Sequence, residues 1–301
     1  MATALLQFLC MSARRIWGAS EGDFPANGSP RQKLEFALRY AALAPTENNW
    51  PSWYFRLADA YVDLMAKTDP AHEDTDPDRR ELMIGCGSAL LYLKVALKHF
   101  GCLGQVDLFP DLGQHTLVAR LHIGFCGERN RQEKLLFEAM PESGANRSPL
   151  GETPLTETML AALGHAAAGE RCWLEFVQSE TGRQHVLEVT LTDDRNLGFW
   201  NEPEDEPVIA SATLAVVKTK TDDKHGWLEA GQIMARTVLE AQALGLSWAF
   251  FDPVRRRAAR EALRTGVGHK GFAQVILCFG PLVADEMIQA AAPTADESAF
   301  Q

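Results

Sequence analysis

The feature that most constrains the fold of this chain is an internal similarity, because part of its second half restates part of its first. Residues 78–101 (DRRELMIGCGSALLYLKVALKHFG) align without gaps with residues 222–245 (DDKHGWLEAGQIMARTVLEAQALG). Two glycine pairs fix the offset at 144 positions: Gly87 with Gly231, and Gly101 with Gly245. Two similar units in one chain can form a binding site at a pseudo-twofold interface, as the subunits of a homodimer do.

The composition limits the class of protein. The chain has 301 residues, enough for one large domain or two of ordinary size, and 46% of them are hydrophobic. Its formal net charge of −11 argues against a nucleic acid as the main partner. No apolar stretch approaches the ~20 residues of a membrane span, and arginines follow the N-terminal apolar run instead of preceding it. We therefore expect a protein that is neither membrane-bound nor secreted, with an ordinary helix at its N-terminus.

The cysteines and histidines give no sign of a metal site. No two cysteines have the CxxC spacing, and the eight histidines show no ligand spacing. Small buried hydrophobic residues in a reducing compartment explain the cysteines better than disulfides do. We assign no metal and expect a cytoplasmic location. The six cysteines are Cys10, Cys86, Cys102, Cys126, Cys172 and Cys278.

The first half carries clear helix signals. Ser29, followed by Pro30 and by Gln32 three positions on, predicts a capped helix that ends at or before Ala44. A second helix is predicted to open at Asp76-Pro77 and to end at Gly101, because apolar residues recur along it at steps of three and four. Its continuous apolar stripe implies deep burial. The predicted strands are 53–57, 61–65, 106–109 and 117–123.

The second half repeats this order of elements. The predicted helices are 155–166, 223–244 and 254–264, and the predicted strands are 172–178, 186–192, 213–219, 247–251 and 272–279. Because each unit contributes strands, we expect one shared sheet in an intertwined α+β body. The predicted division is a first repeat at 1–139, a Gly- and Pro-rich connector at 140–154, a second repeat at 155–285 and a flexible tail at 286–301. The two repeats are expected to form one compact body.

Residues 44–53 (APTENNWPSW) are the most unusual segment of the chain. They join the end of a predicted helix to a strand, and they place several hydrogen-bonding side chains and two tryptophans in a short turn. Small polar groups of this kind can hydrogen-bond a flat heteroaromatic ring while the tryptophans shield it from water. The competing interpretation is a well-capped turn anchored by a core tryptophan, and position alone favours it.

Several short motifs follow one another along about residues 14–282. They are Ala44-Pro45-Thr46 with Asn49 and Trp53, Arg80-Glu81-Leu82 with Gly87, Asn146 to Leu150, Asp222-Asp223, Trp227 to Gln232, and Gln274 to Gly280. Each motif is weak alone, but together they resemble the flavin-dependent nitroreductase family. The nearest branch looks like the single-chain one, in which two fused repeats replace the usual dimer. The resemblance implies a nitroreductase-like fold, with a mixed and mostly antiparallel sheet flanked by helices.

The resemblance also implies FMN bound across the interface of the repeats. NAD(P)H would reduce the flavin, and a small-molecule acceptor such as a nitroaromatic or a quinone would reoxidise it. The flavin would carry the hydride chemistry, so we name no catalytic side chain, and the protein would orient the ring and bind its phosphate. The implied cofactor-binding residues are Thr46 and Asn49 for the ring, and Arg14, Arg15, Arg147 and Ser148 for the phosphate.

Some of these charges have a plainer interpretation. Arg14 and Arg15 could be solvated charges near a chain end. Lys218 and Lys220 end a predicted strand near the interface and could neutralise a flavin edge, but alternating lysines at a strand end are more often surface charges. A fused pseudo-dimer needs no partner to complete its interface, and further association stays open.

Three departures from the family pattern support a second hypothesis. Pro51-Ser52 stands where the family has Gln-Pro, Cys278 stands where a basic residue is usual, and no Lys or Arg follows Gly280. An FMN phosphate carries close to two negative charges, and a poor match to them costs binding free energy. The alternative is a non-catalytic relative that binds or sequesters flavin weakly, or has lost it. A purely structural interaction protein is a third possibility.

Overall fold

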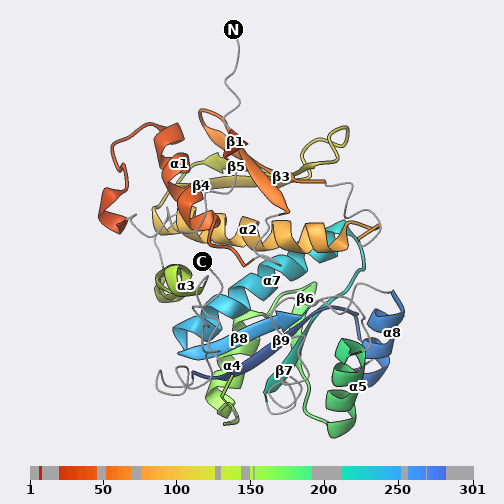
Figure 1. The fold of residues 1–301 in the computed structure, drawn as a ribbon. Helices are drawn as coiled ribbons and strands as arrows, with labels where there is room; N and C mark the ends of the chain where they lie inside the picture. The colour runs from red at the N-terminus through yellow and green to blue at the C-terminus, as the bar shows by residue number, and fades with distance from the viewer. Residues whose placement is uncertain are drawn as a thin grey trace, which may run out of the picture.

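The computed structural model describes residues 7–8, 20–45, 52–68, 76–125, 130–143, 150–151, 153–191, 212–251, 257–268 and 270–282. Two β-sheets with their helices make up the fold, and two long helices pack against each other between the sheets (Figure 1). The upper sheet in Figure 1 comes from the first half of the chain and the lower sheet from the second.

The first half forms a five-stranded antiparallel sheet with strand order β1-β2-β3-β5-β4. Its strands are β1 (Gln7–Phe8), β2 (Trp53–Leu57), β3 (Tyr61–Ala66), β4 (Leu103–Leu108) and β5 (Leu117–Ile123). Its helices are the 3₁₀ turn η2 (Glu21–Asp23), α1 (Pro30–Ala41), α2 (Arg80–His99) and α3 (Arg131–Ser143).

The second half forms a four-stranded antiparallel sheet with strand order β6-β7-β9-β8. Its strands are β6 (Cys172–Phe176), β7 (Thr213–Thr219), β8 (Leu246–Phe251) and β9 (Phe272–Pro281). Its helices are α4 (Glu157–Ala166), α5 (Glu180–Leu191), α7 (Lys224–Ala243) and α8 (Arg257–Gly266).

The two halves share one topology. The order β2-β3-β5-β4 of the first sheet matches β6-β7-β9-β8 of the second, with the strands taken in sequence order. The long helices α2 and α7 have 20 residues each and begin at aligned positions, Arg80 and Lys224. Among the described residues, α5 and α8 of the second half have no counterpart in the first, and they pack against each other (Figure 1).

The α+β class with two similar units is confirmed, but the expected single shared sheet is wrong, because the strands form one sheet in each half. The helix pair explains the separation. One side of α2 packs in the core of the first sheet, and one side of α7 packs in the core of the second. Since the two helices also pack on each other, they hold the sheets apart as outer layers (Figure 1).

Helix α2 is the centre of the first core. It is long and apolar enough to cross a membrane by length and composition alone, yet 83% of its apolar window is buried inside the fold. Cys86, Ala89, Leu90 and Leu93 have no exposed surface. The apolar stripe read from the sequence is therefore the packing surface of a core helix.

The predicted helix ends are confirmed where glycine or a capping box specifies them. Ser29 Oγ accepts a hydrogen bond from Gln32 N (3.3 Å), and Gln32 Oε1 accepts one from Ser29 N (2.8 Å). Gly101 and Gly245 follow α2 and α7 with φ of +65° and +70°. Glycine adopts this left-handed conformation without the steric cost that a Cβ imposes.

The start of α2 corrects the prediction that Asp76-Pro77 opens the helix, since α2 begins at Arg80. Residues 76–79 instead form a turn, in which Arg79 N donates to the Asp76 carbonyl oxygen (2.9 Å). The Asp76 carboxylate still caps the helix from this turn, accepting from Arg80 N (2.8 Å) and Leu82 N (3.1 Å).

Three other predictions are corrected. Residues 186–191 of the strand predicted at 186–192 are instead the end of α5, because Ser179 Oγ accepts from Gly182 N (3.0 Å) at the helix start and Val186 is fully buried. Residues 7–8 are extended and pair with β2, where a helix was expected. Helix α3 was not predicted, and it reaches Ser143, inside the predicted connector. The four described cysteines are buried, as expected, while Cys10 and Cys126 lie outside the described residues.

Candidate functional site

The two halves meet where α2 and α7 cross at a pair of glycines. A Cβ atom on Gly87 would lie 2.2 Å from the Leu228 carbonyl oxygen, and one on Gly231 would lie 2.0 Å from that of Ile84. Only glycine allows the two backbones to approach this closely. The contacts are reciprocal, because Ile84 and Leu228, like the two glycines, are 144 positions apart. The helix pair therefore has local pseudo-twofold symmetry.

A buried arginine links the halves beside this crossing. Arg80 is 2% exposed, its Nε donates to Gln274 Oε1 (2.9 Å), and its Nη2 donates to the Gln274 carbonyl oxygen. Gln274 Nε2 in turn donates to Thr219 Oγ1 (2.9 Å) and to Asp222 Oδ1 (3.1 Å). A buried charge is costly unless it is hydrogen-bonded, so these bonds fix the start of α2 against β9.

The same network orients Trp227 near the start of α7. The indole Nε1 donates to Asp222 Oδ1 (2.7 Å), and Arg260 Nε lies 3.4 Å from Asp222 Oδ2. The next residue, Asp223, caps α7, and the backbone hydrogen bond from Gly226 is the main cause that lowers the pKa of its carboxyl. Burial opposes this shift. The carboxylates of Asp222 and Asp223 thus hold this end of the interface.

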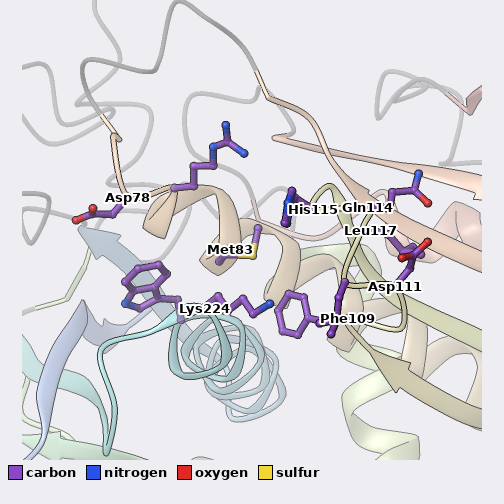
Figure 2. Close-up of a pocket in the computed structure, with 11 residues that line it drawn as sticks. Asp78, Met83, Phe109, Asp111, Gln114, His115, Leu117 and Lys224 are labelled. Carbon is purple, nitrogen blue, oxygen red and sulfur yellow. The ribbon is translucent and has the colours of Figure 1, made fainter.

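A cavity of about 250 Å³ opens beside the first residues of α2 and α7 (Figure 2). Both halves of the chain contribute walls to it, and the lining mixes charged, aromatic and aliphatic groups. The lining residues are Asp78 and Arg79 from the turn before α2, Met83 from α2, Phe109, Asp111, Leu112, Gln114 and His115 from the β4–β5 connection, Leu117 from β5, and Lys224 and Trp227 from α7.

Phe109 joins the β4–β5 connection to α7 across the cavity. Lys224 Nζ lies over its ring, 4.3 Å from the centroid (Figure 2), and the His225 ring meets it edge to face at 4.6 Å. Phe109 and Arg79 are the non-glycine residues with positive φ in the described part of the chain, at +48° and +59°. Such conformations cost ~1–3 kcal/mol and tend to cluster at functional sites. Both residues line this cavity.

The ends of the unusual turn also contact α2. Ser88 Oγ donates to the Pro45 carbonyl oxygen (3.3 Å), and a Cβ on Gly85 would lie 2.6 Å from Ser52 Oγ. Trp53 is buried and packs against Phe55 with 5.2 Å between ring centroids. The two ends of the turn are therefore held against α2, and Trp53 is a core tryptophan.

The sequence is similar to proteins that carry a name. The chain is 25% identical, over an alignment of 319 residues, to a Mycobacterium tuberculosis protein named "Putative NAD(P)H nitroreductase Rv3131", with 89% of this chain and 90% of that protein covered. A second protein of that organism, "Putative NAD(P)H nitroreductase acg", is 21% identical, with 84% of this chain and 90% of that protein covered. The chain is a relative of proteins named as nitroreductases. The recognition made from the motifs is thereby confirmed, although no protein-family model matches the sequence.

Solved structures give a weaker likeness. A nitroreductase with bound FMN from Bacteroides fragilis is 12% identical and has a TM-score of 0.36, with 57% of this chain and 98% of that chain covered. An NADPH:FMN oxidoreductase from Vibrio harveyi, complexed with NAD⁺, is 14% identical and has a TM-score of 0.38, with 50% and 70% covered.

The described cavity does not fit a whole FMN molecule, the cofactor that the nitroreductase resemblance implies. Its volume of about 250 Å³ falls below the ~300–1,000 Å³ of typical ligand sites. Asp78 and Asp111 line it together with Arg79 and Lys224, so its charges do not select a phosphate dianion. The cavity therefore supports no step of flavin chemistry.

The predicted cofactor-binding residues cannot be placed at this interface. All six lie outside the described residues, and their assignments stay predictions: Arg14, Arg15, Thr46, Asn49, Arg147 and Ser148. The described residues nearest to Thr46 and Asn49 in sequence are Pro45 and Ser52, which lie on either side of them and contact α2.

Lys218 corrects both interpretations of the strand-end lysines. It is fully buried, and its Nζ donates to Glu175 Oε2 (3.0 Å) and to the Gly268 carbonyl oxygen (2.7 Å). It is therefore neither a surface charge nor free to approach a flavin edge, because it binds the segment that follows α8. Lys220 is exposed, as a surface charge. Cys278 is completely buried, and burial raises the pKa of its thiol.

Sequence reasoning missed the contact between Arg80 and Gln274. Both residues belonged to motifs, but neither was given a role, because their positions are 194 residues apart in the chain. One signal was available: Gln274 is a lone amide in an otherwise apolar strand, and a buried amide needs hydrogen-bond partners.

Proposed function

We propose that the protein is an NAD(P)H-dependent oxidoreductase of the nitroreductase type, with FMN bound at the interface of its two halves. The observation that carries this proposal is the extent of the similarity, which covers 89% of this chain and 90% of a protein named as an NAD(P)H nitroreductase. Such an alignment includes both halves and the interface between them. The reciprocal contact of α2 and α7 supports a pseudo-dimeric arrangement.

In this proposal the two halves are repeats, at 1–139 and 155–285, joined by a connector at 140–154. Thr46 and Asn49 hold the edge of the flavin ring, and Arg14, Arg15, Arg147 and Ser148 bind the phosphate. Guanidinium groups suit that task because they donate paired hydrogen bonds to phosphate oxygens. A bound flavin would supply the hydride chemistry, with a small molecule such as a nitroaromatic or a quinone as the acceptor. We also propose a cytoplasmic location.

An FMN titration of the purified protein tests this proposal. We expect saturable uptake of FMN, and Arg147→Ala should weaken it at least tenfold, a change of ~1.4 kcal/mol. Arg131→Ala is the matched control, because Arg131 is an exposed arginine at the start of α3 and has no proposed role. Equal affinities for the two variants would remove Arg147 from the phosphate site. Failure of the wild-type protein to take up FMN would refute the proposal.

A second candidate is a non-catalytic protein of this fold that binds or sequesters flavin weakly. The small volume and mixed charge of the described cavity favour it. The two candidates differ in redox chemistry. A sequestering protein would bind FMN without becoming a better catalyst of NAD(P)H oxidation than free FMN, whereas the oxidoreductase would accelerate that reaction with an added quinone.

A further inference from the structure

The cavity beside the first residues of α2 and α7 has no part in the proposed function, and the apolar residues that line it are held in place. Met83 and Leu117 are 6% and 2% exposed. Trp227 is half-buried, and its indole is oriented by the 2.7 Å hydrogen bond to Asp222. Phe109 adds a second aromatic ring (Figure 2). An apolar surface fixed before binding loses little conformational entropy when a ligand packs on it.

The charged residues around this apolar surface are balanced, with histidine counted as neutral. The basic side chains are Arg79 and Lys224, the acidic ones are Asp78 and Asp111, and all four residues are exposed. Figure 2 shows Asp78 and Asp111 well separated, with Lys224 between them in this view. An anionic ligand would meet two carboxylates and a cationic ligand would meet two cations, so neither is favoured. A zwitterion can place each of its charges beside an opposite one.

Arg79 has a conformation that favours glycine. Its φ of +59° lies in the left-handed region, where a Cβ imposes a steric cost that glycine avoids. Its side chain is exposed and makes no ion pair with any other described residue. Glycine would therefore serve the turn before α2 better than arginine does. A strained residue whose side chain has no partner in the fold indicates a role in binding a ligand.

We propose that this cavity binds a free amino acid with an apolar side chain. The carboxylate of the ligand lies beside Arg79 and Lys224, and its side chain packs on the apolar surface. Asp78 adjoins Arg79 in the chain, which leaves Asp111 as the carboxylate that faces the ammonium group. The cavity volume of about 250 Å³ suits a molecule smaller than the ligands of typical sites, which need ~300 Å³ or more. This inference goes beyond the proposed function, and its tests need no FMN.

Isothermal titration of the purified protein with leucine, methionine and phenylalanine is the direct test. We expect saturable binding of one molecule per chain for at least one of them, and the absence of binding by all three would overturn the inference. For leucine, isocaproate lacks the ammonium group and isoamylamine lacks the carboxylate. Each analogue should bind at least tenfold more weakly than leucine, because it leaves one set of charges in the cavity without a partner. An analogue that binds as tightly as the amino acid would refute recognition of a zwitterion.

Two substitutions separate binding from folding. Arg79→Gly should raise the melting temperature of the protein, because glycine relieves the strain, and should weaken amino-acid binding at least tenfold. Asp111→Asn should weaken amino-acid binding by a similar factor without weakening the binding of isocaproate, which has no ammonium group. Asp59→Asn is the matched control, because Asp59 lies between β2 and β3 and does not line the cavity. Wild-type affinity for the amino acid in either Arg79→Gly or Asp111→Asn would contradict the assignment.

Discussion

Replacing Gly87 with alanine should destabilise the protein, although alanine is the better helix former. The added Cβ would lie 2.2 Å from the Leu228 carbonyl oxygen, whereas an unstrained C···O contact is ~3.3 Å. The helices would therefore have to separate by about 1 Å. The Cβ would be fixed to the backbone of α2, and the Leu228 carbonyl oxygen belongs to the backbone of α7, so neither can move away as a flexible side chain can. Overpacking should therefore cost ~3 kcal/mol, the upper end of its range. Alanine recovers ~1 kcal/mol of helix propensity. The net expected loss is ~2 kcal/mol.

Urea unfolding followed by far-ultraviolet circular dichroism measures this change. Gly164→Ala is the matched control, because Gly164 is also helical and its Cβ would lie 3.7 Å from Phe176 Cε2, an ordinary contact. That variant should be as stable as wild type or more stable. Gly231→Ala should cost about as much as Gly87→Ala, and the double variant less than their sum, because one helix separation relieves both clashes. If Gly87→Ala behaves like Gly164→Ala, the close crossing of α2 and α7 is refuted.

Three further predictions concern charged groups. Arg80→Ala should lower the free energy of unfolding by ~3 kcal/mol, because it leaves the buried Gln274 oxygens without their donor, and wild-type stability in a denaturant titration would contradict the network. Burial alone would raise the pKa of Asp63, but hydrogen bonds from Arg120 and Arg56 lower it. The contribution of Asp63 to folding stability is therefore present above pH ~4 and is lost as the pH falls through the lower folded pKa. Asp63→Asn should therefore cost ~2 kcal/mol at pH 7 and progressively less in acid, as thermal melts across that range can check. The folded pKa of Glu229 is raised, so its contribution to stability is present below pH ~4 and is lost as the pH rises. Glu229→Gln should therefore be more stable than wild type at pH 7 and equally stable at pH 4. A stability difference that stays constant with pH would contradict the pKa shift.

Much of the fold follows from local sequence signals. The apolar stripe of α2, the capping box at Ser29 and the glycines after α2 and α7 specify elements whose ends depend on nearby residues. The gapless alignment of residues 78–101 with 222–245 pairs Gly87 with Gly231, and the structure brings these two glycines together where the long helices cross. Repetition within a sequence can thus predict a symmetric contact between the repeated helices.

The predictions that were wrong depended on contacts between residues far apart in the sequence. The β-branched residues near Val186 favour a strand locally, but α5 gains more by burying Val186 and packing against α8. Lys218 was interpreted either as a surface charge or as a group near a flavin edge, yet carbonyl groups about 50 residues later in the chain satisfy its ammonium in the interior. The site residues implied by the family resemblance remain predictions, since all six lie outside the described residues.

The most direct test of the central claim is anaerobic reduction of the FMN-loaded protein. We expect NADPH or NADH to bleach the flavin absorption bands, and a quinone or nitroaromatic to restore them over repeated cycles. Protein that holds FMN but whose spectrum does not change on adding either nucleotide would contradict an oxidoreductase and leave a flavin-sequestering protein.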